Sequence, residues 1–156
     1  MPLNQRRGGP REPSYTIDAR SPSVLRLAAA QARDLGHDVV GSAHLLLAIL
    51  ADEDEPAARL LDRHGVTLDT SRHAVAAILA GAHATSSPGD TSRLSPAAMS
   101  AMQRTSAEAR RRGAPDLAPM HLLHALTATP GAADTLGLRD ADLAAVRDDA
   151  RGQLGA

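Results

Sequence analysis

The stretch VLRLAAAQARDLGHDVVGSAHLLLAIL, residues Val24–Leu50, decides the fold of this chain. Apolar residues in its first half recur every three or four positions, which is the spacing of one face of a helix. Gly36 then ends that helix, because glycine adopts the left-handed conformation that closes a helix end. The segment from His44 to Leu50 is apolar on nearly every side, which is typical of a helix buried at the centre of a protein. We therefore expect two packed helices here, the second of them in the core.

The same pattern occurs a second time along the chain. Gly113 and His121 follow Gly36 and His44 at the same interval of 77 residues. Such self-similarity indicates two copies of one structural unit. Each copy has a long helix, a central apolar helix, a short helix and a closing helix. One unit alone cannot bury its central helix, so we predict an all-α fold in which two four-helix repeats pack about a pseudo-twofold axis as an eight-helix bundle.

Stretches rich in Gly, Pro and Ser divide the chain, because these residues favour loops over helices. We predict four segments: an N-terminal tail at 1–16, the first repeat at 17–81, an exposed linker at 82–93 and the second repeat at 94–154. Serines mark three expected helix starts, with Ser21, Ser42 and Ser95 as N-caps. Four residues are predicted to lie in the core: Leu46, Ile49, Leu123 and Leu126.

Composition limits the classes of function. The 156 residues carry a formal net charge of −1 and include one aromatic residue, Tyr15. A chain without a basic surplus has no general attraction for nucleic acid or for an anionic membrane. A chain without aromatic platforms cannot stack the bases of a single strand. We therefore expect neither a nucleic acid nor a membrane as partner.

Three further features concern the cellular setting. The chain has no cysteine, so disulfides and thiolate metal sites are excluded. Its longest apolar run, Leu45–Ala51, is far too short to span a membrane, and the first residues lack the apolar stretch of a signal peptide. A cytoplasmic location is the expectation. All basic residues are arginine and alanine is abundant, which suggests a GC-rich, actinobacterial source.

The quoted stretch resembles the N-terminal domain of the ATP-dependent Clp unfoldases. That family has an E-A-R segment, a Leu-Gly-His segment and a G-T-E-H segment at the places of Gln31–Arg33, Leu35–His37 and Gly41–His44. The second half is similar to the family's second repeat. The resemblance implies an eight-helix bundle that binds proteins: Clp unfoldase subunits, adaptors or client proteins. No GxxxxGKS or GxxxxGKT motif occurs, so we expect a stand-alone domain without the ATPase modules.

The resemblance also implies where ligands would bind. In some members the Glu of each G-T-E-H segment helps to recognise phosphoarginine, because a carboxylate complements a guanidinium group. The matching positions here are Ser42 with Ala43, and Pro119 with Met120, so both carboxylates are missing. Actinobacterial members also bind cyclic-peptide antibiotics through aromatic residues near the repeat starts. The residues at those places here are aliphatic: Ile17 and Leu94.

The histidines are the remaining candidates for chemistry. His44 and His121 occupy equivalent positions, and we expect each ring to pack and hydrogen-bond locally at its helix start rather than to form a paired site. His121 and His124 lie on one helix face, but no third ligand is near in sequence, so no metal site is predicted. No nucleophile and base can be paired. We predict no catalytic residue, no cofactor and no enzyme activity.

Two functional hypotheses remain from these observations. The first is a protein- or peptide-binding module that acts as adaptor, decoy or sequestering protein, linked to Clp proteolysis or to Clp-targeting cyclic peptides. The second is a structural or regulatory protein that has lost Clp-type ligands and associates with itself. We expect a monomer or weak dimer. Self-association without binding to Clp subunits or clients would favour the second hypothesis.

Overall fold

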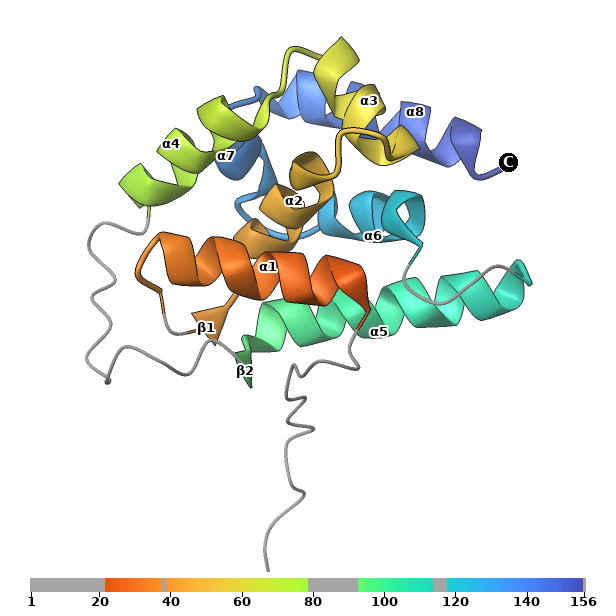
Figure 1. Cartoon of the computed structure of the whole chain (residues 1–156). Coiled ribbons are helices and arrows are strands. Elements are labelled where there is room, and N and C mark those ends of the chain that lie inside the picture. The colour runs from red at the N-terminus through yellow and green to blue at the C-terminus, as the bar shows by residue number, and fades with distance from the viewer. Residues whose placement is uncertain (1–21, 38, 79–92, 114–117, 156) are drawn as a thin grey trace, which may run out of the picture.

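Eight helices make up most of the residues that the computed structural model describes, which are 22–37, 39–78, 93–113 and 118–155 (Figure 1). The first repeat contains α1 (Ser23–Asp34), α2 (Ser42–Ala51), α3 (Pro56–Arg63) and α4 (Leu68–Ile78). The second contains α5 (Pro96–Arg111), α6 (Pro119–Leu126), α7 (Ala132–Leu136) and α8 (Asp140–Gln153). The predicted all-α architecture is confirmed. None of these described helices is both long and apolar enough to cross a membrane.

Local sequence explains where the long helix of each repeat begins and ends. The Oγ atom of Ser95 accepts a hydrogen bond of 3.1 Å from the N–H of Ala98 and so caps α5, as predicted. Pro96 follows in the first turn, where a missing N–H costs nothing. The chain leaves α1 and α5 through Gly36 and Gly113, whose φ angles are 76° and 66°. The two glycines therefore have the same structural role, 77 residues apart in the sequence.

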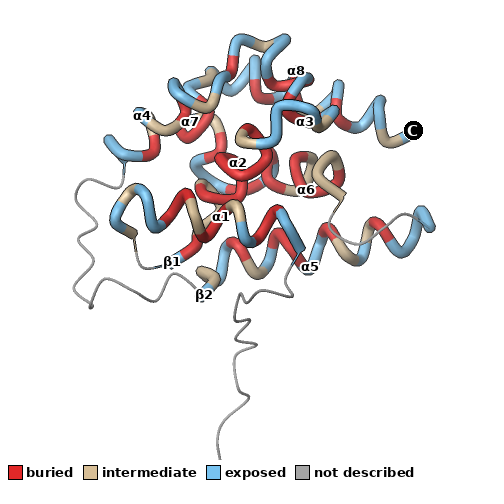
Figure 2. Tube along the Cα trace, viewed as in Figure 1, coloured by how far each residue is buried: buried red, intermediate tan, exposed pale blue. Residues whose placement is uncertain are grey.

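The core is centred on α2, every residue of which from His44 to Leu50 is buried (Figure 2). Helix α6 is its counterpart in the second repeat and is buried along one side. The four predicted core residues are confirmed, since none has more than 1% of its surface exposed: Leu46, Ile49, Leu123 and Leu126. Because the described core contains no Phe, Tyr or Trp, it is built from aliphatic side chains at close distance, mainly Leu and Ala.

Helices of the first repeat pack directly against helices of the second. Helix α4 of the first repeat packs on α7 of the second, and α8 of the second packs on α3 of the first, while α2 contacts α6 (Figure 1). This reciprocity is the pattern expected from a pseudo-twofold axis. At one such contact, Nε2 of His64 lies 2.7 Å from Oδ2 of Asp149. Neither repeat could bury its central helix without the other.

One feature was not predicted: a pair of short parallel strands, β1 (Val39–Val40) and β2 (Arg93–Leu94). Consecutive β-branched valines favour the extended backbone of β1. Arg93, the last residue of the predicted linker, is exposed and lies in β2. The remaining linker residues, 82–92, lie outside the described residues, as do the tail and Ser21. The other segment boundaries stay predictions.

Candidate functional site

The two short strands bring the start of α2 next to the start of α5. Val40 pairs with Leu94, and the N–H of Ser95 donates a hydrogen bond of 2.9 Å to the carbonyl of Val40. A Cβ atom added to Gly41 would lie 3.8 Å from Oγ of Ser95, so the two helix starts are in van der Waals contact. Two of the predicted site residues, Ser42 and Leu94, therefore lie at this junction, each next in sequence to a residue that contacts the other segment, and both are half-buried.

At the start of α2 the side chain of His44, and not that of Ser42, makes the capping hydrogen bond. The N-cap is Gly41, with an extended backbone, and Ser42 is the first helical residue, which corrects the prediction. The N–H of Gly41 donates a hydrogen bond of 2.9 Å to Nδ1 of His44, three residues further on. A side chain at this position that reaches back to the N-cap is one half of a capping box. The expected local role of His44 is confirmed.

His44 belongs to a pair of imidazole rings at this helix start. Its Nδ1 accepts from Gly41, so the neutral ring carries its proton on Nε2. That Nε2–H points to Nδ1 of His37, at 2.9 Å. Burial, and secondly the charge of His37, lower the pKa of His44 from 6.5 to about 4. His44 is therefore neutral at physiological pH and supplies no positive charge for an anionic ligand.

His121 occupies the equivalent position in α6 but behaves differently. Its ring is buried, with 8% of the residue exposed. Within the described part of the chain, neither of its ring nitrogens has a hydrogen-bond partner. The prediction that His121 hydrogen-bonds at its helix start is therefore not met. Nor do the described residues contain any group of three or more His, Asp or Glu side chains that could hold a metal.

The two degenerate family positions lie at opposite ends of α2. Ser42 and Ala43 form its first turn, whereas Pro119 lies beside Ile49 and Asp52 at its other end, in a cleft of about 30 Å³. Met120 is half-buried against the core. The predicted site residues thus form two separate surfaces, one at the start of α2 and one at the start of α6. At the position where the family has Glu, each surface has an uncharged residue, Ala43 or Met120. The last of the predicted residues, Ile17, lies outside the described residues.

Glu108, in the E-A-R segment of the second repeat, is engaged within its own helix. Its Oε1 accepts a bond of 2.6 Å from Nε of Arg112, and its Oε2 lies 3.2 Å from Arg111. The hydrogen bond from Arg112 lowers the pKa of this exposed carboxyl. Arg112 also donates to the carbonyl of Leu154 at 2.9 Å, and so ties α5 to the end of α8. Arg112 therefore stabilises the junction between these two helix ends.

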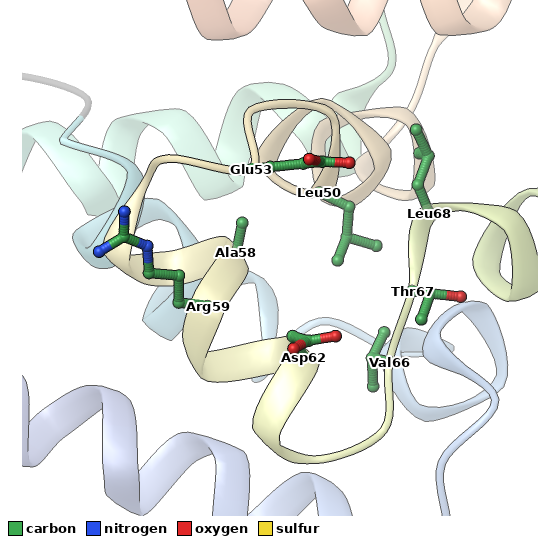
Figure 3. A pocket seen from close by; sticks show the side chains of 8 residues that line it. All are labelled: Leu50, Glu53, Ala58, Arg59, Asp62, Val66, Thr67 and Leu68. Carbon is green, nitrogen blue, oxygen red and sulfur yellow. The ribbon is translucent and has the colours of Figure 1, made fainter.

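A pocket that the sequence did not indicate lies at the C-terminal end of α2 (Figure 3). It has a volume of about 320 Å³. Leu50 of α2 is at its centre, and one face of α3 and the segment leading into α4 form its walls. The rim carries the carboxylates of Glu53 and Asp62. All eight residues that line it belong to the first repeat: Leu50, Glu53, Ala58, Arg59, Asp62, Val66, Thr67 and Leu68.

Comparison with known proteins identifies the family. The model of the Clp repeat N-terminal domain matches residues 16–114, well over half of the chain. The chain belongs to the Clp repeat N-terminal domain family. As one relative, the negative regulator of genetic competence ClpC/MecB of Bacillus subtilis is 36% identical over 86 residues. The match includes 54% of this chain and 11% of that protein, so the chain corresponds to a small part of its relative.

Solved Clp N-terminal domains show that the fold continues beyond the matched residues. The N-terminal domain of the chaperone ClpD from Arabidopsis thaliana superimposes with a TM-score of 0.67 at 22% identity, over 90% of this chain and 96% of that domain. The Hsp104 N-terminal domain from Candida albicans gives a TM-score of 0.63 at 18% identity, over 88% and 91%. The described helices of both repeats therefore share the fold of these domains, including α6, α7 and α8, which lie beyond the residues that the family model matches.

Proposed function

We propose that this Clp N-terminal domain binds extended protein segments and acts in trans on a Clp unfoldase, as an adaptor that delivers clients or as a decoy that withholds them. The observation that carries the proposal is the family match over residues 16–114 together with a two-repeat fold. Protein binding is the general role of this kind of domain. The adaptor or decoy role is our own addition.

The surface between the starts of α2 and α5 is the proposed binding site for such segments. Val39 in β1 is one of the two large hydrophobic residues that are exposed in the described part of the chain, at 40%. Its partner on β2 is the exposed Arg93, whereas Leu94 pairs with buried Val40 and is half-buried against the core. Uncharged Ser42 and Ala43 follow at the start of α2. An exposed aliphatic side chain favours apolar segments of unfolded proteins, because binding removes apolar area from water.

Titration of the chain into fluorescein-labelled casein, monitored by fluorescence anisotropy, tests whether the chain binds an unfolded protein. We expect saturable binding that Val39→Asp weakens by about tenfold, since a charge would have to lose its hydration on binding. Ile78→Asp is the matched control, because Ile78 is also exposed, at 51%, but lies at the end of α4. Absence of binding, or equal effects of the two variants, would overturn the proposed site.

Degradation of casein by a Clp unfoldase with its peptidase tests the role in trans. An adaptor should accelerate degradation when the chain is added, and a decoy should slow it. An unchanged rate would overturn both roles. Sedimentation of the chain alone then tests the second hypothesis, because self-association without any casein binding would make it a structural or regulatory protein.

The narrower role, sequestration of a Clp-targeting cyclic peptide, would use the same surface. Val39 provides exposed apolar area there, and none of the described residues is Phe, Tyr or Trp. A hydrophobic cyclic peptide should then compete with labelled casein for the chain, and Val39→Asp should weaken both ligands together. A cyclic peptide that binds without displacing casein would contradict a shared site.

A further inference from the structure

We propose that the pocket at the C-terminal end of α2 binds the arginine side chain of an extended peptide. The alkyl part would lie on the apolar floor and the guanidinium between Glu53 and Asp62. This inference rests on the proposed function, because it assigns a residue preference to the bound segment. The pocket is distinct from the surface at the helix starts, since Leu50 is eight residues beyond Ser42 and about 12 Å of helix rise separates them.

The floor of the pocket suits an aliphatic stem. Leu50, Ala58 and Val66 form it, and only 5%, 6% and 2% of their surfaces are exposed. The volume of about 320 Å³ lies within the range of about 300–1,000 Å³ that is usual for small-ligand sites. Arginine places three methylene groups along apolar surface while its charged end stays at the rim.

The rim favours a cation. The carboxylates of Glu53 and Asp62 lie on opposite sides of the apolar floor (Figure 3). Neither forms a hydrogen bond or an ion pair among the described residues, so both are available to a ligand. The one cation of the lining, Arg59, points away from the floor and lies 3.9 Å from Asp54. The C-terminal end of α2 adds the partial negative charge of its unpaired carbonyl groups.

The second repeat contains an internal example of the proposed contact. Helix α6 is the counterpart of α2, and its C-cap is Thr127. Arg147 of α8 donates to the carbonyl of Thr127 at 2.6 Å and to its Oγ1 at 3.3 Å. The chain thus supplies its own guanidinium at this helix end. At the end of α2 the C-cap is Asp52, and the carboxylates of Glu53 and Asp62 line the opening. A guanidinium from another chain would make the corresponding contact at the end of α2.

The test uses three-residue peptides with blocked ends, Leu-Arg-Leu and Leu-citrulline-Leu, titrated into the ¹⁵N-labelled chain. Citrulline has the shape of arginine without its charge. The Arg peptide is expected to shift the amide signals of Glu53, Asp62 and Val66, and the citrulline peptide to bind about tenfold more weakly, as expected for the loss of a charge-assisted contact. Equal affinities, or shifts confined to the start of α2, would overturn the proposal.

Variants separate the pocket from general charge effects. Glu53→Gln with Asp62→Asn should lower the affinity for the Arg peptide about tenfold and leave the weak binding of the citrulline peptide unchanged. Asp54→Asn is the matched control, because Asp54 is fully exposed beside the pocket but does not line it. It should leave the affinity for the Arg peptide within about twofold of that of the unmodified chain. Equal losses in the two variants would overturn the inference.

The casein titration distinguishes the two ways of failing. If the chain binds casein but not the Arg peptide, the arginine pocket is refuted and the proposed function stands. If it binds neither, both are refuted. If it binds the Arg peptide but not casein, the pocket is supported as a site, whereas the proposed binding of unfolded protein is refuted.

Discussion

The Nδ1 atom of His37 lies 2.9 Å from the Nε2 atom of His44, and this contact joins the loop after α1 to the start of α2. The opposite nitrogen of His44 accepts the N–H of Gly41, so the ring links a loop and a helix cap at once. Only the neutral form of His44 can do this, because protonation would place a hydrogen on Nδ1, where the acceptor is needed.

Stability should therefore fall in mild acid. The pKa of His44 is lowered from 6.5 in the unfolded chain to about 4 in the fold, so the unfolded chain binds more protons between these values. The stabilisation is fully present above pH 6.5 and is lost as the pH falls towards 4. The shift corresponds to about 3 kcal/mol, at about 1.4 kcal/mol per unit of pKa. Urea unfolding at a series of pH values measures it.

His44→Gln isolates this effect from the other titrating groups. The glutamine oxygen can accept the N–H of Gly41 as the third residue of a capping box does, but it does not titrate. The variant should have a flatter stability profile between pH 4 and 6.5. Ala76→Gln is the control, since Ala76 is exposed and has no titratable side chain, and it should leave the profile unchanged. Parallel profiles for the unmodified chain and His44→Gln would contradict the assignment.

His121→Leu should maintain or increase stability, whereas His44→Leu should reduce it. Both rings are buried, but within the described residues only His44 has hydrogen-bond partners. A buried polar group without a partner costs about 1–3 kcal/mol, and a leucine in its place removes that cost. His44→Leu instead leaves the N–H of Gly41 without its acceptor. Chemical denaturation at pH 7 measures both changes, and equal losses would show that the two rings have the same structural role.

The central position of α2 leads to a third expected outcome. Leu46 is 1% exposed in the shared core, so Leu46→Ala should lower the free energy of unfolding by about 2–5 kcal/mol. Ile78→Ala is the control and should cost less than about 0.5 kcal/mol, because Ile78 is half in water. Thermal or urea unfolding followed by circular dichroism compares them. A loss below about 0.5 kcal/mol for Leu46→Ala would mean that α2 is not central.

The fold could be predicted because its signals are local. Helical spacing and the glycines at positions 36 and 113 each act over a few residues, and both signals occur in each of the two repeats. The strands could not be predicted in this way, because two residues at Val39–Val40 carry too little pattern and their partners lie 54 positions further on. The cap of α2 was missed because Gly41 has no side chain, and its partner is a histidine that acts from inside the helix.

The site was harder to predict than the fold, for the same physical reason. Ser42 and Leu94 could be placed only by resemblance, and the strand pairing that joins them is non-local. The proposed arginine pocket is assembled from a helix end, a helix face and a loop, and its two acidic residues are nine positions apart, Glu53 in a turn and Asp62 in α3. Two carboxylates indicate a cation site only when the apolar floor between them, at Leu50 and Val66, is known.

The last prediction concerns phosphoarginine, which this chain should bind very weakly or not at all in the manner of the family. The guanidinium part of that ligand needs an acceptor at each helix start. Ala43 offers none, and Met120 offers only a thioether. The loss of a charge-assisted hydrogen bond costs about 1.5–3 kcal/mol, which is about tenfold or more in affinity at each site. Calorimetric titration with free phosphoarginine measures this directly, and micromolar binding at two sites would contradict it.

Restoring the carboxylates should restore affinity one site at a time. Ala43→Glu and Met120→Glu each place an acid in the first turn of a helix, where the helix dipole favours it. Because Met120 is half-buried against the core, circular dichroism first checks that the second variant folds. Since Ser42–Ala43 and Pro119 lie at opposite ends of α2, each single variant should gain one site and the double variant two. Ala76→Glu, at an exposed position of α4, adds the same charge elsewhere and should gain none. One shared site in the double variant would show that the two helix starts act together, against the geometry described above.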